Sequence, residues 1–453
     1  MLSVTSERSA AQAATTPGAT TLAETTPAAM TLAGTTPAET TPSETTPPET
    51  TPAITTAATE SGAAIGPAAT ALLGVYRPAA PLFVRGEGSR LFDEEGRGYI
   101  DFTSGLGVNA LGYGDAGLRA AIGAALSGGV LHTSNLFRTA NAARLAEQLV
   151  GHSFADRVFF CNSGGEAMEG ALKFARRWAR EEGGAEKHEV VAMRGSFHGR
   201  LFGTLAVTDR PAFREPFEPV MPGARFVKIE DEAGLTTTIS QTRTAAIVVE
   251  PVQGEGGIRP VPASWLERLR EAATAANALL IFDEVQCGLG RTGRLFAYEN
   301  TGVVPDVVAL AKPLAGGLPM GAVLMTARVA AAIRPGDHAT TFGGGPLVSA
   351  AALHVLERMA EPAFLERVRI MGAHIRERVG GWVGERGVVE LRGVGLMWGL
   401  ESTGAAAEIT ARALAAGLLL APAGERTVRL LPPLTITDEE LDDGLDILWS
   451  VLQ

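Results

Sequence analysis

Residues 306–317 read DVVALAKPLAGG, and residues 278–286 read ALLIFDEVQ. In each stretch a short apolar run gives way to a polar or glycine-rich segment, which is typical of a buried strand followed by a loop. Three earlier stretches have the same form: RVFFCNSGGE at 157–166, EVVAMRGSFHGR at 189–200 and AAIVVEPVQGEGG at 245–257. Helical patterns separate several of them. The sequence therefore predicts an α/β fold with a mostly parallel central sheet and helices on both faces.

Polar residues follow all five predicted strands. Ligands of such sheets bind beyond the carboxyl ends of the strands, so we expect the five segments to form one site. Lys312 follows the run VVALA, and Asp283 ends the run ALLIF. A lysine at this position can be desolvated, which lowers its pKa and makes its amine a nucleophile for carbonyl groups. For each residue taken singly, a solvated lysine and a structural aspartate are the competing interpretations.

The segment Ser163-Gly164-Gly165 stands at the start of a predicted helix. Small residues at such a turn leave backbone N–H groups free to hold an anion, although an ordinary helix N-cap remains the alternative. Residues 288–293, GLGRTG, match GxGxxG but lack the following helix and acidic residue of a dinucleotide site, so we interpret them as a connecting loop. Together these candidate residues predict a ligand that has a phosphate, an aromatic nitrogen and an aldehyde. Pyridoxal phosphate has all three groups.

Composition excludes several other classes of protein. The 453 residues include 39 Lys and Arg against 50 Asp and Glu, a net charge of −11, which excludes nucleic-acid binding through a basic surface. No apolar run approaches the length of a membrane span, and no secretory signal precedes the chain, so no membrane association is expected. Cys161 and Cys287 form neither a disulfide framework nor a zinc motif, which predicts a cytoplasmic protein without a metal site.

Residues 1–68 consist largely of TTP repeats with almost no large apolar side chains, which predicts a disordered tail. A glycosylated stalk, an organelle transit peptide and a dispensable extension are the possible roles. The extension is favoured because a stalk requires export and a transit peptide requires several arginines, whereas only Arg8 precedes Arg77. Beyond the tail we expect an N-terminal segment of a small domain at 69–125, a large domain at 126–345, and a smaller α+β C-terminal domain at 346–453.

The motifs after the tail resemble those of the class III, ornithine-type, pyridoxal-phosphate aminotransferases. They run in the family's order through LFDEEGRGYIDF, HTSNLF, VFFCNSGGEAMEGALKFARR, SFHGR, VEPVQGEGG, IFDEVQCGLGRTG, PDVVALAKPLAGG, HATTFGGGPL and TVRLLPPL. The resemblance implies fold type I of the pyridoxal phosphate-dependent transferases, with pyridoxal 5'-phosphate as cofactor. HTSNLF, and Gly105 and Leu106 where ornithine enzymes place a tyrosine, favour the acetylornithine group of the family.

The resemblance also implies the cofactor site. Lys312 would bind the cofactor's aldehyde and then move the substrate proton, and Asp283 would keep the pyridine nitrogen protonated. Phe197 would stack on the ring, and Gln286 would face the 3-hydroxyl group. Thr341 would reach the phosphate of the neighbouring subunit, which implies a homodimer with shared active sites. The remaining cofactor contacts would come from Ser163, Gly164, Gly165 and Val285.

For the substrate, the resemblance implies two carboxylate clamps, Arg200 and Arg429, and a residue, Glu255, that pairs with Arg429 when no carboxylate is bound. Glu250, Thr340 and Asn135 would complete the substrate site. The implied reaction moves the ω-amino group of N-acetylornithine to 2-oxoglutarate and yields glutamate. Carrier-linked aminoadipate semialdehyde or lysine, succinyldiaminopimelate, ornithine and 4-aminobutyrate are the alternative substrates of the same chemistry.

Two other classes of function remain as rivals, an aminomutase and a non-catalytic binding protein. An absolute need for 2-oxoglutarate would exclude the aminomutase, and intact Lys312 and Asp283 argue against the binding protein. His198 has no second histidine at metal-ligand spacing, so we expect it to support the site rather than hold a metal. Cys287 is expected to be inert packing.

Overall fold

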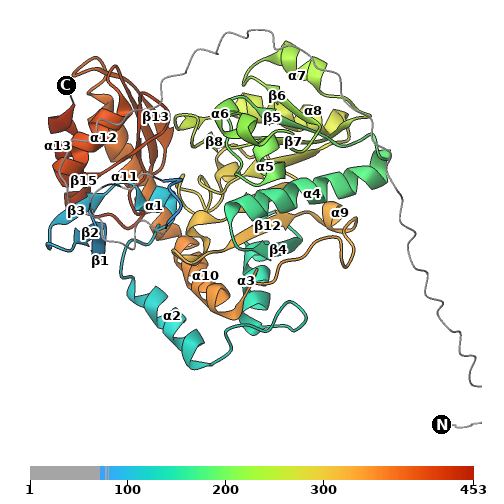
Figure 1. Cartoon of the computed structure of the whole chain (residues 1–453), viewed down its shortest axis with the longest axis horizontal. Helices are drawn as coiled ribbons and strands as arrows, with labels where there is room; N and C mark the ends of the chain where they lie inside the picture. Colours follow the sequence, from blue (N-terminus) through green and yellow to red (C-terminus); the bar gives the residue numbers. More distant parts are fainter. Residues whose placement is uncertain (1–71, 77–78, 80, 453) are drawn as a thin grey trace, which may run out of the picture. The chain divides into compact units, whose positions relative to one another are not determined.

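A computed structural model describes residues 72–76, 79 and 81–452, and the predicted tail at 1–68 lies outside these residues. At its centre is a seven-stranded sheet with the strand order β4-β12-β11-β10-β7-β5-β6 (Figure 1). Its strands are β4 (Arg157–Cys161), β5 (Glu189–Met193), β6 (Ala224–Val227), β7 (Thr244–Val249), β10 (Leu279–Asp283), β11 (Val307–Leu310) and β12 (Gly321–Met325). β12 runs antiparallel to both of its neighbours, β4 and β11, and the other pairs of this sheet are parallel. The predicted mostly parallel sheet is confirmed.

Side chains of each central strand alternate between two cores. In β10, Leu280 and Phe282 belong to one core, whereas Leu279 and Ile281 belong to the other. Helix α4 (Gly164–Gly183) contributes to the second core, and the first is closed by α3 (Ala140–Gly151), α8 (Ala263–Ala275) and α10 (Pro346–Met359). Both faces of the sheet are therefore covered by helices, which explains why its strands are apolar without a polar alternation.

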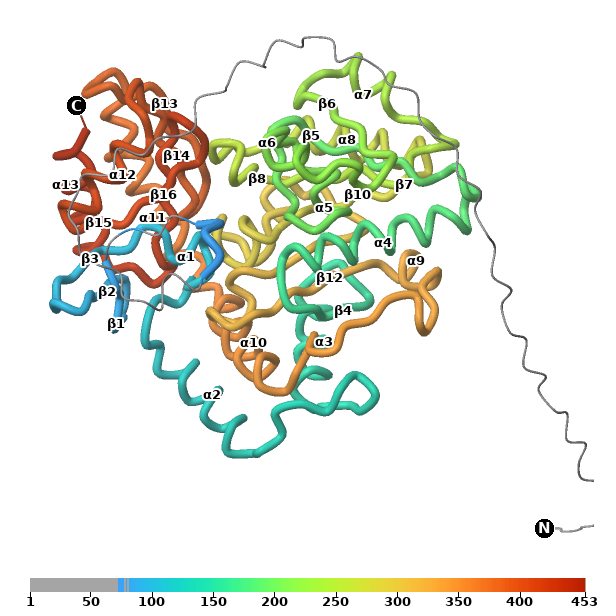
Figure 2. The backbone as a smooth tube through the Cα atoms, viewed as in Figure 1, coloured from blue at the N-terminus to red at the C-terminus, as the bar shows by residue number. Residues whose placement is uncertain are grey.

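The first and last parts of the described chain build two smaller sheets. One has the order β1-β2-β3-β15 and the other β13-β14-β17-β16. In Figure 2 the blue N-terminal strands lie beside the red C-terminal elements, as the parallel pairing of β3 with β15 requires. The elements are β1 (Phe83–Glu87), β2 (Arg90–Asp93), β3 (Gly98–Asp101), α11 (Pro362–Gly380), β13 (Val388–Val394), β14 (Met397–Ser402), α12 (Ala406–Ala415), β15 (Leu418–Leu419), β16 (Ala421–Pro422), β17 (Thr427–Leu430) and α13 (Asp438–Val451).

Short elements connect these layers. They are α1 (Ser104–Gly107), α2 (Ala116–Ser127), α5 (Phe202–Ala206), α6 (Pro211–Arg214), η2 (Glu215–Phe217), α7 (Glu232–Thr238), β8 (Val252–Gln253), β9 (Arg259–Pro260), η3 (Ala297–Asn300), η4 (Lys312–Ala315) and α9 (Ala327–Ala330). Helix α10, which begins the predicted C-terminal domain, packs against α2 and α3. The domain boundaries at 126 and 346 remain predictions. Within the described residues, no helix is both long and apolar enough to cross a bilayer.

Candidate active site

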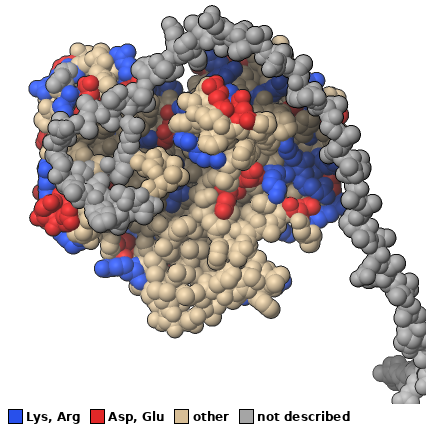
Figure 3. All heavy atoms as spheres, viewed as in Figure 1, with Lys and Arg blue, Asp and Glu red and all other residues tan. Residues whose placement is uncertain are grey.

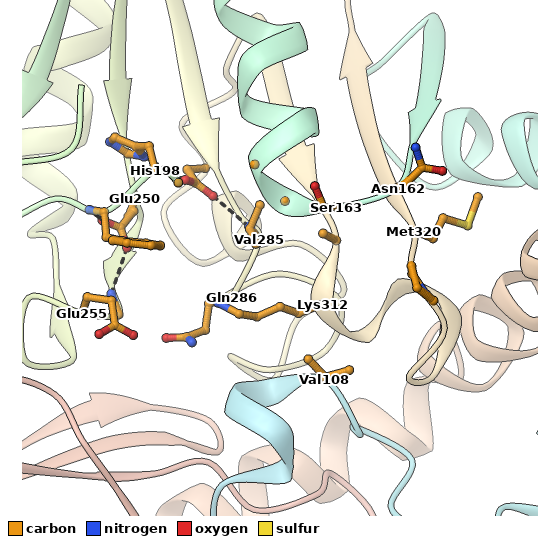
Figure 4. A pocket seen from close by; sticks show the side chains of 18 of the residues that line it. Val108, Asn162, Ser163, His198, Glu250, Glu255, Val285, Gln286, Lys312 and Met320 are labelled. Carbon is orange, nitrogen blue, oxygen red and sulfur yellow. Dashed lines mark hydrogen bonds and ion pairs between the residues drawn. The ribbon is translucent and has the colours of Figure 1, made fainter. Parts of the chain in front are cut away.

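The polar segments that follow β4, β5, β7, β10 and β11 line one cavity of about 330 Å³ (Figure 4). The structure thus brings together all five segments that the sequence predicts to meet. Parallel strands deliver their carboxyl ends to one edge of a sheet, which explains the convergence. The cavity residues from these segments are Asn162, Ser163, Gly164, Gly165, Phe197, His198, Gly199, Glu250, Gly254, Glu255, Asp283, Val285, Gln286, Ala311 and Lys312.

Asp283 ends β10 on the floor of the cavity and is held by two hydrogen bonds. The Nδ1 atom of His198 donates to its Oδ2 at 2.8 Å, and the backbone N–H of Val285 donates to its Oδ1 at 3.0 Å. Burial alone would lower the pKa of His198, but the hydrogen bond and charge of Asp283 outweigh burial and raise that pKa. The pair therefore presents a fixed carboxylate to the cavity, and His198 supports it as predicted.

Lys312 is the first residue of η4, directly after β11, and its side chain extends into the cavity beside Gln286 (Figure 4). Burial is the main cause that lowers its pKa, and the charge of Arg429 adds to the effect. The charges of Asp283, Glu255 and Glu250 oppose the shift without cancelling it. The ammonium form of Lys312 is thus destabilised relative to the amine, which is the form that attacks carbonyl carbon.

Ser163 is the N-cap of α4, and its Oγ accepts the backbone N–H of Glu166 at 3.1 Å. The N-cap interpretation is therefore correct, and the anion interpretation stands beside it because Gly164 and Gly165 line the cavity. Backbone N–H groups of a first helical turn have no acceptor within the helix. A Cβ atom at Gly164 would come within 2.6 Å of the Val285 side chain, so only glycine fits there.

Glu250 is buried between two loops of the site. Its carboxylate oxygens accept the backbone N–H groups of Phe197 and Gly254, each at 2.9 Å. Burial raises the pKa of Glu250 to about 7, against the opposing charge of His198. Glu250 thereby fixes the backbone of Phe197, whose ring lines the cavity and meets the ring of Phe213 edge to face at 6.5 Å. The hydrogen bonds of Glu250 are thus made to the backbone of the two loops, one of which positions the Phe197 ring.

Gln286 reaches the opposite wall of the cavity. Its Nε2 donates to the carbonyl of Leu106 at 3.1 Å, while its Oε1 is buried without a hydrogen-bond partner among the described residues. Leu106 has a positive φ of 64°, a strained conformation for a non-glycine residue that is frequent at ligand sites. An unpaired buried acceptor favours a ligand that donates a hydrogen bond to it.

Arg429 on β17 is buried, and its Nη1 lies 2.6 Å from the Oε1 of Glu255. Its Nη2 donates to the carbonyl of Pro422 at 2.8 Å, and its Nε has no partner in the described part of the chain. Glu255 is about one third exposed and lines the cavity, so the side of the pair that faces a ligand is the carboxylate. Release of Glu255 would present a buried guanidinium to a ligand carboxylate.

Five of the predicted residues do not line this cavity: Arg429, which meets it through Glu255, and four others. Arg200 is exposed, with its guanidinium 3.5 Å from the centre of the Phe213 ring. Thr340 accepts hydrogen bonds from Asn162 at 3.1 Å and, through its carbonyl, from Asn135 at 2.6 Å. Thr341 lines two neighbouring cavities instead. The roles of Arg200, Thr340, Thr341 and Asn135 therefore remain predictions.

Sequence patterns miss part of the cavity wall. Leu318, Pro319 and Met320, just before β12, line the cavity, as does Val108 after α1. The antiparallel direction of β12 brings its first residues, rather than its last, to the same edge of the sheet. The predicted loop interpretation of 288–293 agrees with the structure, in which no helix follows Gly293 directly. Cys287 is fully buried, and burial raises its pKa well above the usual value, consistent with inert packing.

The described residues contain no cluster of three or more His, Cys, Asp or Glu side chains with metal-ligand geometry. The remaining donor set is a lysine amine, a carboxylate, an amide oxygen, an aromatic ring and the N–H groups at the start of a helix. Such a set matches a small anionic organic ligand with a carbonyl group.

Known proteins are similar to this chain in sequence and in fold. A family model described as aminotransferase class-III matches residues 75–452. The mitochondrial acetylornithine aminotransferase of Alnus glutinosa is 47% identical over 387 residues, which cover 84% of this chain and 85% of that protein. The succinylornithine transaminase of Citrobacter koseri is 43% identical over 381 residues, or 83% of this chain and 93% of that protein. The solved structure of N-acetylornithine aminotransferase from Stenotrophomonas maltophilia K279a aligns with a TM-score of 0.70 at 38% identity, covering 83% of this chain and 96% of that one.

Proposed function

The chain belongs to the class-III aminotransferase family, and from that premise we propose that it moves the ω-amino group of N-acetylornithine to 2-oxoglutarate. It is an aminotransferase, whose substrates are small amino and keto compounds. One observation supports the reaction class: a lysine amine of lowered pKa lies in the same cavity as a fixed aspartate and a helix N-terminus. The choice of substrate rests on the relatives that are named for acylated ornithine.

The residues of the cavity fit pyridoxal phosphate. The N–H groups of Gly164 and Gly165 suit its phosphate, and the Asp283 carboxylate suits a protonated pyridine nitrogen. The unpaired Oε1 of Gln286 suits the 3-hydroxyl group, and the Phe197 ring suits the face of the pyridine. When bound, the cofactor supplies an electron sink for the carbanion that forms when the amino donor loses its proton.

The protein's own contribution is proton transfer and orientation. The Lys312 amine would act as the base that removes the proton from the carbon bearing the amino group, and the same amine would return a proton later in the transfer. Asp283, held in place by His198, would face the pyridine nitrogen of the bound cofactor and accept a hydrogen bond from it. Wall residues such as Val108 and Met320 limit access of water to the reacting atoms.

The ion pair between Glu255 and Arg429 supports a two-substrate role. An ω-amine donor brings no carboxylate near its reacting carbon, so Glu255 can stay on Arg429. Glutamate reacts at its α-amine and brings a carboxylate next to that carbon, and this carboxylate can replace Glu255 on the buried guanidinium. In the proposal the more distant carboxylate of either donor meets Arg200 at the exposed end of the site.

A second candidate keeps the reaction and changes the acyl group. The relative from Citrobacter koseri is named a succinylornithine transaminase, which makes N-succinylornithine the alternative donor. Carrier-linked aminoadipate semialdehyde or lysine, succinyldiaminopimelate, ornithine and 4-aminobutyrate complete the set to be compared.

The test is a single-donor half-reaction with purified, cofactor-loaded enzyme. Its readout is the loss of the absorbance at about 420 nm that marks lysine-bound cofactor. We expect N-acetylornithine and glutamate to discharge the band fastest, with unacylated ornithine and 4-aminobutyrate much slower. Discharge by glutamate alone would exclude both acylated ornithines as donors and leave the reaction class intact. No discharge by any amino donor would contradict the aminotransferase assignment itself.

We further propose a homodimer in which Thr341 of the partner subunit completes the phosphate site. The position of Thr341 supports this proposal, because the residue does not line the cavity of its own chain. We also propose a cytoplasmic location, since the two cysteines are free and buried. Fractionation of cells that express the tagged chain tests the location, and recovery from an organelle would contradict it.

A further inference from the structure

A second cavity, of about 410 Å³, lies over the later part of α4 and shares no residue with the active site. Lysine and arginine side chains gather over this part of α4 in Figure 3. The cavity is lined by five of them and one acid, Asp337; the five are Lys173, Arg176, Arg177, Arg180 and Lys187. The whole chain has a net charge of −11, so this local excess of positive charge is opposite in sign to the charge of the protein as a whole.

Helical geometry creates the cluster. Lys173, Arg176, Arg177 and Arg180 have the spacing i, i+3, i+4 and i+7, which places all four on one face of α4. The opposite face packs into the core through Ala175 and Trp178. Like charges three and four residues apart destabilise a helix, so this arrangement raises the free energy of the helix unless negative charge lies nearby.

The protein supplies little of that negative charge. Arg177 has carboxylate partners, Glu181 at 2.8 Å and Asp337 at 3.0 Å. Within the described residues, Lys173, Arg176, Arg180 and Lys187 have no carboxylate within 4.0 Å, whereas most arginines elsewhere in the molecule are in ion pairs.

The partners of these four cations are neutral or absent. The Nζ of Lys187 donates to the carbonyls of Gln241 at 2.7 Å and Ala276 at 3.0 Å. Arg176 donates to the carbonyls of His188 and Pro222. The Nζ of Lys173 lies 2.9 Å from the ring of His338, and Arg180 has no side-chain partner in the described part of the chain; these last two side chains are exposed. Four cations thus surround the cavity without a counterion.

Burial makes the missing counterion costly. It lowers the pKa of Arg176 and of Lys187, and the more distant charges of Glu169 and Glu182 only partly oppose this. The helix dipole favours Arg180 in the last turn of α4 but does not account for Lys173 or Arg176, which lie farther from that end. An anion in the cavity would relieve both the desolvation and the repulsion.

We propose that this cavity is a binding site for a small polyanion of the phosphate kind. Several uncompensated cations around a small space require a compact group with more than one negative charge, and phosphate oxygens match the arginine fork. The cavity has room for a diphosphate or a phosphorylated metabolite. Because the site is separate from the cofactor cavity, the protein can hold both ligands at once.

The test compares thermal stability and calorimetric binding in cofactor-loaded enzyme, so that the phosphate cradle at Gly164 is filled. Sodium pyrophosphate is the probe, and sodium chloride of equal ionic strength controls for screening. We expect pyrophosphate to raise the Tm and chloride not to do so. The Lys173→Ser, Arg180→Ser double variant removes two exposed cations and should bind pyrophosphate at least tenfold more weakly. Without the anion its Tm should stay close to that of the native protein, because the repulsion removed offsets the lost dipole interaction of Arg180 and the lower helix propensity of serine.

Arg119→Ser is the matched control, since Arg119 is an exposed helical arginine outside both cavities; it should bind pyrophosphate like the native protein. Equal binding by the double variant, or no pyrophosphate-specific rise in Tm, would overturn the site. Binding of citrate without pyrophosphate would overturn the phosphate assignment. Comparison of pyrophosphate with adenosine diphosphate tells a free from an organic phosphate, and tighter binding of either supports the site.

Discussion

Lys312 is positioned for its chemistry by backbone geometry. It begins η4 directly after the buried strand β11, and Pro313 follows it in the first turn. Only burial and more distant charges act on its Nζ within the described residues, with no hydrogen bond to it, so nothing competes with a ligand for the amine. Together with the lowered pKa, this leaves a reactive amine at the centre of the cavity.

Lys312→Ala removes that amine and should abolish the absorbance at about 420 nm when pyridoxal phosphate is added, because no other amine in the cavity can condense with the aldehyde. Lys228→Ala, at an exposed lysine outside the cavity, should keep the band. The measurement is an absorbance titration with cofactor. An unchanged band in Lys312→Ala would show that the wrong lysine has been assigned.

Glu255→Gln tests the ion pair with Arg429. The neutral amide competes less well for the guanidinium, so the α-carboxylate of glutamate should bind more easily, and the KM for glutamate should fall about tenfold, which corresponds to roughly 1.4 kcal/mol. The KM for N-acetylornithine should not fall in parallel, since this donor leaves Arg429 paired. Steady-state kinetics with each donor make the comparison. Equal changes in both KM values would exclude a selective role for the pair.

At the scale of elements, the turn from β4 into α4 explains why the glycine at position 164 is required. A Cβ at Gly164 would lie 2.6 Å from the Val285 side chain, whereas at Gly165 the nearest atom would be 3.7 Å away. Gly164→Ala should therefore cost about 1–3 kcal/mol through overpacking and weaken cofactor binding, while Gly165→Ala should change both far less. Cofactor titration and the Tm of each variant measure the two effects. Equal losses in both variants would contradict the steric argument.

Glu284, next to Asp283, holds the start of η3 in place through hydrogen bonds. Its two carboxyl oxygens accept the backbone N–H groups of Ala297 at 2.6 Å and Tyr298 at 2.8 Å. Burial raises its pKa to about 8 from an ordinary 4.5, despite these hydrogen bonds. The folded state therefore retains a proton that the unfolded state loses. The stabilisation from this group is complete below pH 4.5 and is lost as the pH rises towards 8.

Glu284→Gln should be less stable than the native protein by on the order of 1–3 kcal/mol at pH 5.5, because its NH₂ group replaces one of the two acceptors. The difference should shrink by pH 8.5, where the native protein has to bury a charged carboxylate. Urea unfolding at the two pH values measures it, with the exposed Glu267→Gln as control. A difference that stays constant or grows with pH would contradict the assigned proton.

Strand β12 shows where prediction from local sequence stops. The five parallel strands and the residues after them follow from apolar runs that end in polar segments, as at Asp283 and Lys312. The order of the strands depends on long-range pairing, which no local pattern contains. β12 lies between β4 and β11 in the antiparallel direction, so the residues just before it, such as Met320, reach the cavity without a local signal in the sequence. The hydrogen bond from His198 to Asp283 joins residues 85 positions apart and was equally beyond local patterns.

At the scale of the whole molecule, a single chain provides the cavity with a lysine, an aspartate and a helix N-terminus, but it does not bring Thr341 there. The family match also begins at residue 75, so the predicted tail at 1–68 contributes nothing to it. The proposed dimer would supply the missing threonine from a second copy. Thr341→Ala should then weaken cofactor binding even though the residue lies outside its own cavity.

Mixed dimers distinguish a partner's threonine from the chain's own. One chain carries Lys312→Ala and the other Thr341→Ala, and each homodimer has impaired sites. If Thr341 acts across the interface, one site of every hybrid combines both changes and the other has neither, so an equal mixture that assembles at random regains about one quarter of native sites. If Thr341 acts within its own chain, no native site forms. Cofactor absorbance and turnover of the co-expressed pair decide between the two, and failure to regain either would exclude the shared site.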